Sequence, residues 1–150
     1  MRRIVAVDPG ASGAFAFQDA DGNVCTQKMP DGMTAQVDFI LSLRAKSPIA
    51  CFVIEKVGGY MPGNSAIAAV KFARHCGNLE AACYALGMSV VEVAPSKWMA
   101  SIGTLPTDKP ERKRAIKERM ARLYPHLHVT LDTADSLGIY TWAINGGVSV

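Results

Sequence analysis

Two runs of hydrophobic residues, each ending in an acid, set the framework of this chain. Residues 3–8 are almost continuously apolar up to Asp8, and residues 50–55 are apolar up to Glu55. Runs of this length and character are typical of buried strands, because a strand covered on one face alternates polar and apolar positions. Residues 89–93 are predicted to form another strand. We expect the first of these strands to be buried on both faces.

Two further strand-like segments follow the first strand and predict a hairpin. Residues 14–17 and 23–29 have the composition of strands, and residues 18–22, Gln-Asp-Ala-Asp-Gly, supply a polar turn between them. Turn residues between two such segments are a hairpin signal. Together with residues 3–8, the hairpin predicts an antiparallel meander of three strands.

Helical spacing of apolar residues predicts most of the remaining elements. Thr34 and Ser65 are suitable N-caps for two of the helices, and Gly87 is a suitable stop for the second. Residues 94–98 are expected to form a short turn and residues 103–110 a polar loop. The expected helices span residues 35–44, 65–86, 111–123 and 132–144.

Strands that come first and then alternate with helices indicate an α/β fold. The chain has 150 residues, of which 49% are hydrophobic and 19% charged, and this fits one globular domain over residues 1–150. Its apolar runs are much shorter than the roughly 20 residues of a membrane span, so we expect a cytoplasmic protein without membrane contact. The 4 cysteines lack the spacing of a zinc site and are interpreted as reduced core thiols.

Four carboxylates occupy positions that folding alone does not require. Asp8 and Glu55 each end a predicted strand, while Asp132 and Asp135 lie one turn apart at the start of the last predicted helix. Taken separately, Asp8 also fits a turn, and Asp132 also fits an N-cap. Taken together, the four acids can converge on one point, where their repulsion favours bound cations. Mg²⁺ prefers such oxygen ligands, and two ions about 3.5–4 Å apart can promote phosphodiester hydrolysis.

Positive charge is concentrated just before the last predicted helix. The net charge of the chain is only +3, but the segment 109–122 has far more basic than acidic residues. Such a run is often a solvated helix face, yet here too few acids are present to pair with it. The segment therefore indicates a polyanionic partner. Its basic residues are Lys109, Arg112, Lys113, Arg114, Lys117, Arg119 and Arg122.

The order of these features resembles that of the ribonuclease H-like nucleases, and within them that of the RuvC-type Holliday-junction resolvases. The matching motifs are Ile4-Val-Ala-Val-Asp-Pro-Gly10, Val53-Ile-Glu-Lys-Val57 and Asp132-Thr-Ala-Asp-Ser-Leu-Gly-Ile139. The resemblance covers nearly the whole chain and includes the position of the basic segment. It implies a five-stranded mixed sheet flanked by helices, in which three antiparallel strands are followed by parallel ones.

The resemblance also implies an activity. It implies a homodimer that binds four-way DNA junctions and cuts two strands symmetrically with Mg²⁺ or Mn²⁺, two ions per active site. The four acids are then the expected catalytic metal ligands. Lys97 and Lys113 match positions at which the family uses lysines near the cleaved phosphate, so we expect both to contact DNA and one to be catalytic. The expected contacts to the DNA backbone are Arg112, Arg114, Lys117 and Arg119.

The loop after Glu55 departs from the family pattern. The family carries an aromatic residue shortly after the strand-end Glu, thought to probe the junction centre, whereas the third residue after Glu55 is Gly58. We therefore expect Tyr60 or Met61 to contact that centre. The helix at 65–86 is the expected dimer interface, because apolar and small side chains surround much of it. These side chains are Ile67, Val70, Phe72, Ala73, Cys76, Leu79, Ala82 and Cys83.

Three other interpretations stand beside a junction resolvase. The segment Asp8-Pro-Gly-Ala-Ser-Gly13 also resembles the phosphate loop of sugar kinases and actin-like ATPases, but those enzymes enclose the nucleotide between two domains, for which 150 residues are too few. The second is a nuclease of the same fold that acts on flaps, other branched DNA or RNA–DNA hybrids. The third is a non-catalytic protein that binds branched DNA, which would not need all four acids.

Overall fold

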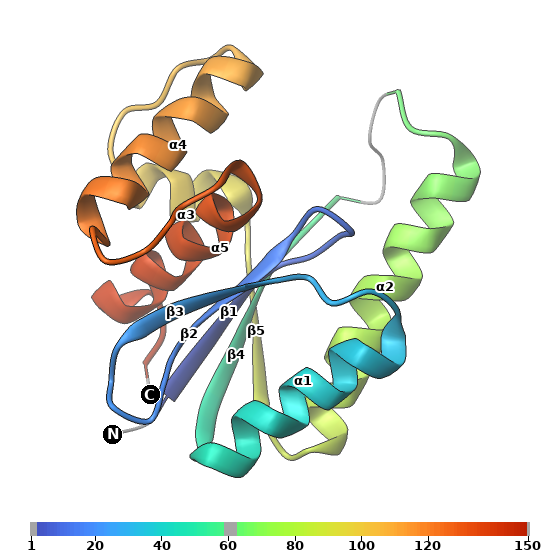
Figure 1. Cartoon of the computed structure of the whole chain (residues 1–150). Coiled ribbons are helices and arrows are strands. Elements are labelled where there is room, and N and C mark those ends of the chain that lie inside the picture. Colours follow the sequence, from blue (N-terminus) through green and yellow to red (C-terminus); the bar gives the residue numbers. More distant parts are fainter. Residues whose placement is uncertain (1–2, 59–62, 150) are drawn as a thin grey trace.

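The computed structural model describes residues 3–58 and 63–149. These residues form one sheet of five strands in the order β3-β2-β1-β4-β5 (Figure 1). Each strand lies within about one residue of its predicted position. The strands are β1 (Arg3–Asp8), β2 (Ala14–Gln18), β3 (Val24–Lys28), β4 (Ile49–Glu55) and β5 (Ser89–Val93).

The pairing of the strands places two of the acids side by side. The pairs β1–β2 and β2–β3 are antiparallel, whereas β1–β4 and β4–β5 are parallel. This confirms the predicted mixed sheet. Val7 of β1 pairs with Ile54 of β4, so the residues that follow them, Asp8 and Glu55, lie next to each other at the same edge of the sheet.

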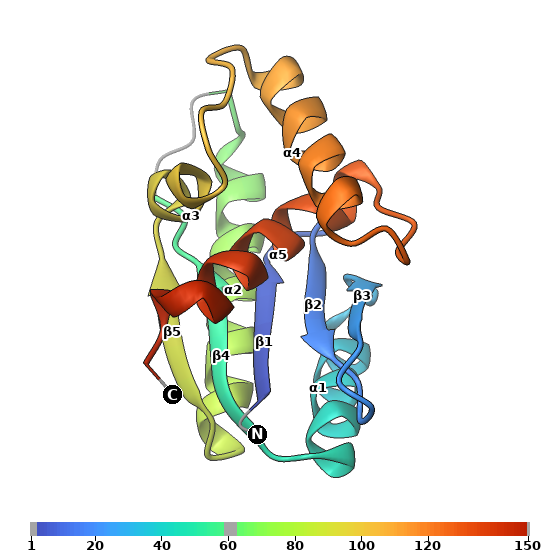
Figure 2. The same ribbon diagram turned by 90° about the vertical axis from the view of Figure 1, so that its left-hand side faces the viewer.

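Helices cover both faces of the sheet (Figures 1 and 2). The helices α1 and α2 pack on one face, and α3, α4 and α5 pack on the other. They are α1 (Met33–Lys46), α2 (Ala66–Ala85), α3 (Pro95–Ser101), α4 (Lys109–Leu123) and α5 (Leu131–Trp142), which continues into a short π-helix, η1 (Ala143–Gly147). Among the described residues, no helix is long and apolar enough to cross a membrane.

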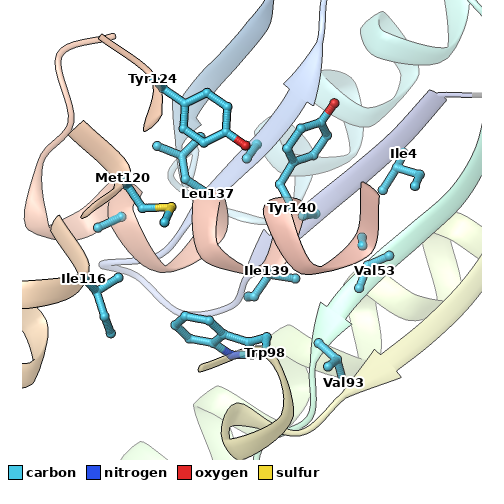
Figure 3. Close-up of a cluster of buried hydrophobic side chains, with 14 of the residues drawn as sticks. Ile4, Val53, Val93, Trp98, Ile116, Met120, Tyr124, Leu137, Ile139 and Tyr140 are labelled. Atoms are coloured by element: carbon cyan, nitrogen blue, oxygen red, sulfur yellow. The ribbon is translucent and has the colours of Figure 1, made fainter. Parts of the chain in front are cut away.

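The two faces of β1 belong to two separate hydrophobic clusters, as the apolar run in the sequence predicts. Ile4 and Ala6 join the cluster under α3, α4 and α5, which includes Trp98 and Leu137 (Figure 3). Val5 and Val7 join the cluster under α1 and α2. Each fully buried side chain of this kind contributes about 1.5–3 kcal/mol relative to exposure. Packing on both sides therefore holds the carboxyl end of β1, and with it Asp8, in a fixed place.

Two local predictions are wrong. Residues 94–98 do not form a simple turn, because α3 begins at Pro95, and proline is well tolerated in the first turn of a helix. Thr34 is not an N-cap, because α1 already begins before it, with Gly32 as the capping residue. The backbone of Gly32 has φ 81°, a left-handed conformation that glycine adopts without strain.

Candidate active site

A cleft of about 490 Å³ opens at the edge of the sheet where β1 and β4 end. It is lined by the strand-end acids Asp8 and Glu55, by Asp135 from α5, and by Lys113 from α4. The fold therefore brings together three of the four predicted acids from elements that are far apart in the sequence. A predicted basic residue, Lys113, lines the same cleft and lowers the pKa values of all three acids.

Asp8 is the most strongly perturbed of these acids. Its pKa is raised to about 8, above all by burial and then by the negative charges of Asp135 and Glu55. The positive charge of Lys113 lowers this pKa without cancelling the effect, and the charge of Asp132 makes the smallest contribution. Burial and the two neighbouring acids thus disfavour the charged form of Asp8, and a cation bound beside its carboxylate would favour that form.

Glu55 is held by a neighbour that the sequence did not single out. The indole Nε1 of Trp98 donates a hydrogen bond of 2.6 Å to Oε2 of Glu55. Burial raises the pKa of the Glu55 carboxyl, while this hydrogen bond lowers it, because the bond favours the charged form. The net shift is upward. Trp98 is fully buried and lines the same cleft.

The first turns of α5 place its two acids in different surroundings. The helix is capped by Thr130, whose side chain and that of Thr133 satisfy each other's backbone N–H groups in a capping box, so Asp132 is not the N-cap. Asp135 lies in the cleft, where burial raises its pKa and the charges of Lys113 and Arg112 lower it. The cleft acids and Asp132 are therefore held by different neighbours.

Asp132 is paired with a lysine from the edge strand β3. Its Oδ2 lies 2.9 Å from Nζ of Lys28. The strand register explains the encounter: Asp8 pairs with Ala14 across β1 and β2, and Ala14 pairs with Lys28 across β2 and β3. Lys28 therefore stands at the same edge of the sheet as the cleft. Three of the four acids therefore line the cleft, whereas Asp132 is paired with this lysine.

Apart from Arg119, the basic residues predicted to contact DNA fall into three groups. Lys113 and Arg112 line the cleft, and Arg112 also donates a hydrogen bond of 2.8 Å to the Thr107 carbonyl. Arg114 and Lys117 are exposed on α4. Lys97 is exposed on α3 and is not among the described residues that line the cleft.

Arg119 is only partly exposed and makes hydrogen bonds within the protein. One of its guanidinium nitrogens donates a hydrogen bond of 2.9 Å to the carbonyl of Ile102, and another donates to the carbonyl of Thr104. These bonds tie α4 to the loop that follows α3. Much of the hydrogen-bonding capacity of Arg119 is therefore used within the protein.

The predicted junction-probing residues Tyr60 and Met61 lie outside the described residues. Val57 and Gly58, which lead into that segment, line the cleft. Phe72 of α2 also lines it, and its ring lies 3.4 Å from the place a Cβ of Gly10 would occupy. Sequence reasoning did not single out Phe72 for the site, because its apolar character fits a helix core or a dimer face equally well.

The donor chemistry fits hard divalent cations, although the ligands are not gathered around one point. The described residues contain no group of three or more His, Cys, Asp or Glu side chains close enough to hold a metal ion. Two acids have other partners, Trp98 for Glu55 and Lys28 for Asp132. The cleft nevertheless offers three carboxylates, and such oxygen donors are the ligands that Mg²⁺ and Mn²⁺ prefer. Side-chain rotation of the acids would be needed for a common ion to be held.

Comparison with known proteins gives matches in structure only. No protein-family model matches the sequence, and no curated protein sequence matches it. The structure of Thermus thermophilus RuvC is similar, with a TM-score of 0.63 and 14% identity over 97% of this chain and 96% of that chain. RuvC from T. thermophilus in complex with a Holliday junction substrate gives a TM-score of 0.62, with 14% identity over 97% of both chains. A Fowlpox virus resolvase in complex with substrate Holliday junction DNA gives 0.58, with 13% identity over 98% of this chain and 99% of that chain.

These similarities and the strand order define the class of fold. A five-stranded mixed sheet in the order β3-β2-β1-β4-β5, flanked by helices, is the ribonuclease H-like fold. Within that fold, the protein is structurally similar to RuvC-type and poxvirus Holliday-junction resolvases at low sequence identity. The predicted fold is thereby confirmed.

Proposed function

We propose that this protein is a metal-dependent DNA endonuclease that resolves four-way junctions by paired cuts. The observation that carries this proposal is that Asp8, Glu55 and Asp135 line one cleft together with Lys113 of the basic helix α4. The fold supports it, because similar structures were solved with Holliday junction substrates. The fold alone would not suffice, since one fold can host unrelated activities.

The acids have distinct tasks in this proposal. Asp8, Glu55 and Asp135 hold Mg²⁺ or Mn²⁺, and Asp132 completes the ligand set for two ions. When bound, such ions supply an activated water and stabilise the leaving oxygen of a phosphodiester. The two hydrophobic clusters keep the ends of β1 and β4 in register, so that the acids are presented from a rigid edge.

The helix α4 supplies the positive surface for DNA. Lys113 lies in the cleft beside the acids, and this position favours it over Lys97 as the lysine that offsets charge at the cleaved phosphate. Lys97 is assigned to DNA contact outside the cleft. Arg114 and Lys117 are exposed and suit contacts to backbone phosphates, which position DNA without reading its sequence. We assign Arg112 to the phosphate nearest the cleft.

The junction centre is assigned to the segment that follows β4. Val57 and Gly58 line the cleft, and Tyr60 and Met61 follow them closely in the sequence. A base at the centre of a junction is more exposed than one in a continuous duplex. An aromatic ring stacking on such a base is worth about 1–3 kcal/mol.

Paired cuts need two active sites, and α2 offers a surface on which two copies can meet. Ile67 is 71% exposed, Val70 59% and Tyr84 63%, although all three are large and apolar or aromatic. The opposite side of the helix is buried through Leu79 and Cys83. Small residues between the exposed side chains allow two helices to approach closely. We infer a two-fold homodimer with α2 at its interface.

A cleavage assay with four substrates separates the possible functions. Purified protein is incubated with a four-way junction, a flap, an RNA–DNA hybrid and a plain duplex, with Mg²⁺ and with chelator. We expect paired, symmetric cuts in the junction alone, abolished by chelator. Preferred cleavage of the flap or hybrid would instead establish another nuclease of this fold. Tight junction binding with no cleavage in Mg²⁺ or Mn²⁺ would establish a non-catalytic binder.

A further inference from the structure

Trp98 contacts two of the elements that supply acids to the cleft, β4 and α5. It lies in the middle of α3, is 0% exposed, and donates its indole N–H to Glu55 at the end of β4. Figure 3 shows its ring beneath α5, beside Ile139. The same helix carries Asp135, one turn before the contact. Trp98 is therefore wedged between the element that supplies Glu55 and the element that supplies Asp135.

Gly138 of α5 makes this placement possible. A Cβ at Gly138 would lie 2.5 Å from Cζ3 and 2.8 Å from Cε3 of Trp98, so any larger residue would have to displace the ring. A helix interior normally disfavours glycine by about 1 kcal/mol relative to alanine. The close fit against α5 restricts the indole, so its N–H points at Oε2 of Glu55 with little freedom.

We propose that Trp98 is a positioning residue for Glu55, which fixes the orientation of its carboxylate for metal binding. The bond of 2.6 Å engages Oε2 and restricts rotation of the carboxylate about its last torsion. Oε1 is left free of this bond. Groups that hydrogen-bond to metal ligands orient them in the same manner, and their loss typically weakens metal binding 10–100-fold. This role rests on the proposed metal-dependent function.

A purely structural role for Trp98 makes a different prediction. A buried indole needs an acceptor for its N–H, and Glu55 could serve only that need. In that case, removal of the N–H would alter stability but not the affinity of the cleft for metal. The two roles are therefore separated by metal binding, measured without DNA and without turnover.

The first test replaces Trp98 by Phe, which keeps an aromatic ring and removes the donor. Binding of Mn²⁺ to the complete protein is measured by calorimetry for wild type, Trp98→Phe and Trp142→Phe. Trp142 is the matched control, because it ends α5 and is half-buried outside the cleft. We expect Trp98→Phe to weaken Mn²⁺ binding about tenfold and Trp142→Phe to leave it unchanged. Equal Mn²⁺ affinity in wild type and Trp98→Phe would overturn the positioning role.

An isosteric replacement covers the case in which Trp98→Phe does not fold. Benzothienylalanine has sulfur in place of the indole N–H and nearly the same shape, so it removes the donor without leaving a cavity. Introduced at position 98 in the Trp142→Phe background, it should also weaken Mn²⁺ binding about tenfold. In a Glu55→Gln background, either replacement should weaken Mn²⁺ binding much less than in wild type, because Trp98 acts on the metal through Glu55. Additive losses in that double-mutant cycle would contradict the role.

The indole resonances of the wild-type protein distinguish failure of this role from failure of the proposed function. In a ¹⁵N-labelled sample, Mn²⁺ should broaden the Trp98 indole signal well before that of Trp142. If neither signal responds and calorimetry shows no Mn²⁺ binding to wild type, the metal-dependent function itself is wrong. If wild type binds Mn²⁺ and the Trp98 replacements bind it equally well, only the positioning role is wrong.

Discussion

Nζ of Lys28 lies 2.9 Å from Oδ2 of Asp132, and this ion pair separates Asp132 from the other three acids. Both partners retain solvent access, with 65% of the lysine side chain and 35% of the aspartate side chain exposed. Ion pairs at such exposed positions contribute only about 0–1 kcal/mol to stability. The pair is thus weak enough to open when a cation or a phosphate competes for either partner.

If the proposed function is right, removal of Lys28 should lower the Mg²⁺ concentration that the protein needs for cleavage. In Lys28→Ala, Asp132 no longer has a competing cation, and we expect the Mg²⁺ concentration for half-maximal junction cleavage to fall several-fold. Lys46→Ala is the matched control, because Lys46 is exposed in the last turn of α1, before β4 begins, and lies at the opposite edge of the sheet from Glu55. A Mg²⁺ dependence of Lys28→Ala equal to that of Lys46→Ala would show that the pair does not restrain Asp132.

The stability of the metal-free protein should decrease as pH rises. The pKa of Asp8 is about 8 in the folded protein, against an ordinary value of 3.8. Because the folded state binds this proton more tightly than the unfolded state, the stabilisation is complete below the ordinary pKa and is lost as pH rises towards about 8. In chelator, melting temperatures should fall between about pH 5 and pH 8, and Mg²⁺ should offset the loss. Asp8→Asn should flatten this dependence; an equally steep decline in that variant would assign the effect to other groups.

Arg119 and Lys117 should differ although both belong to the basic segment. Arg119→Ala removes the hydrogen bonds to the Ile102 and Thr104 carbonyls, so we expect a loss of about 1–3 kcal/mol in the free energy of unfolding. Lys117 is exposed, so Lys117→Ala should leave stability unchanged and reduce the log–log salt slope of junction binding by roughly one. Denaturant unfolding measures the stability of both variants, and junction binding at several salt concentrations measures the salt slope. Equal stability of the two variants would contradict the structural assignment of Arg119.

The proposed dimer should depend on the exposed face of α2. Ile67→Glu places a charge on a side chain that is 71% exposed in the single chain, so it should leave the fold intact and shift sedimentation from dimer to monomer at micromolar concentration. Ile144→Glu, at a side chain 49% exposed in η1, is the control and should remain dimeric. Wild-type protein that sediments as a monomer and still makes paired, symmetric cuts would rule out the dimer.

The positions of Asp8, Glu55 and Asp135 were predictable from the pattern of buried residues together with the order of the elements. The apolar runs before Asp8 and Glu55 identify strands covered on both faces, and parallel pairing then brings the two strand ends to one edge. Asp135 follows from helical spacing, which turns it toward that edge from α5. The strands and the helical spacing needed only local patterns, whereas the parallel pairing that brings the strand ends together was implied by the resemblance.

The partners of these acids were harder to predict. Trp98 lies in α3, a helix of 7 residues, too short for a periodic apolar pattern, and its contact with Glu55 depends on how α3 packs against Gly138. The position of Lys28 near Asp132 could have been inferred more easily from the sequence, through the register of the predicted hairpin. The hairpin register places Lys28 opposite Ala14, and thus two strands from Asp8. Lys97 was placed by resemblance, and its neighbour Trp98 is the residue of α3 that reaches Glu55.

The most direct test of the central claim is single-turnover cleavage of a four-way junction by Asp8→Asn in Mg²⁺. Asp38→Asn is the matched control, because Asp38 is exposed on α1 and outside the cleft. We expect Asp8→Asn to bind the junction at least as tightly as wild type, because a negative charge facing the phosphates is removed, and to cleave it at least a thousandfold more slowly. Asp38→Asn should cleave at the wild-type rate. Cleavage by Asp8→Asn at the wild-type rate would contradict the assignment of this cleft as the active site.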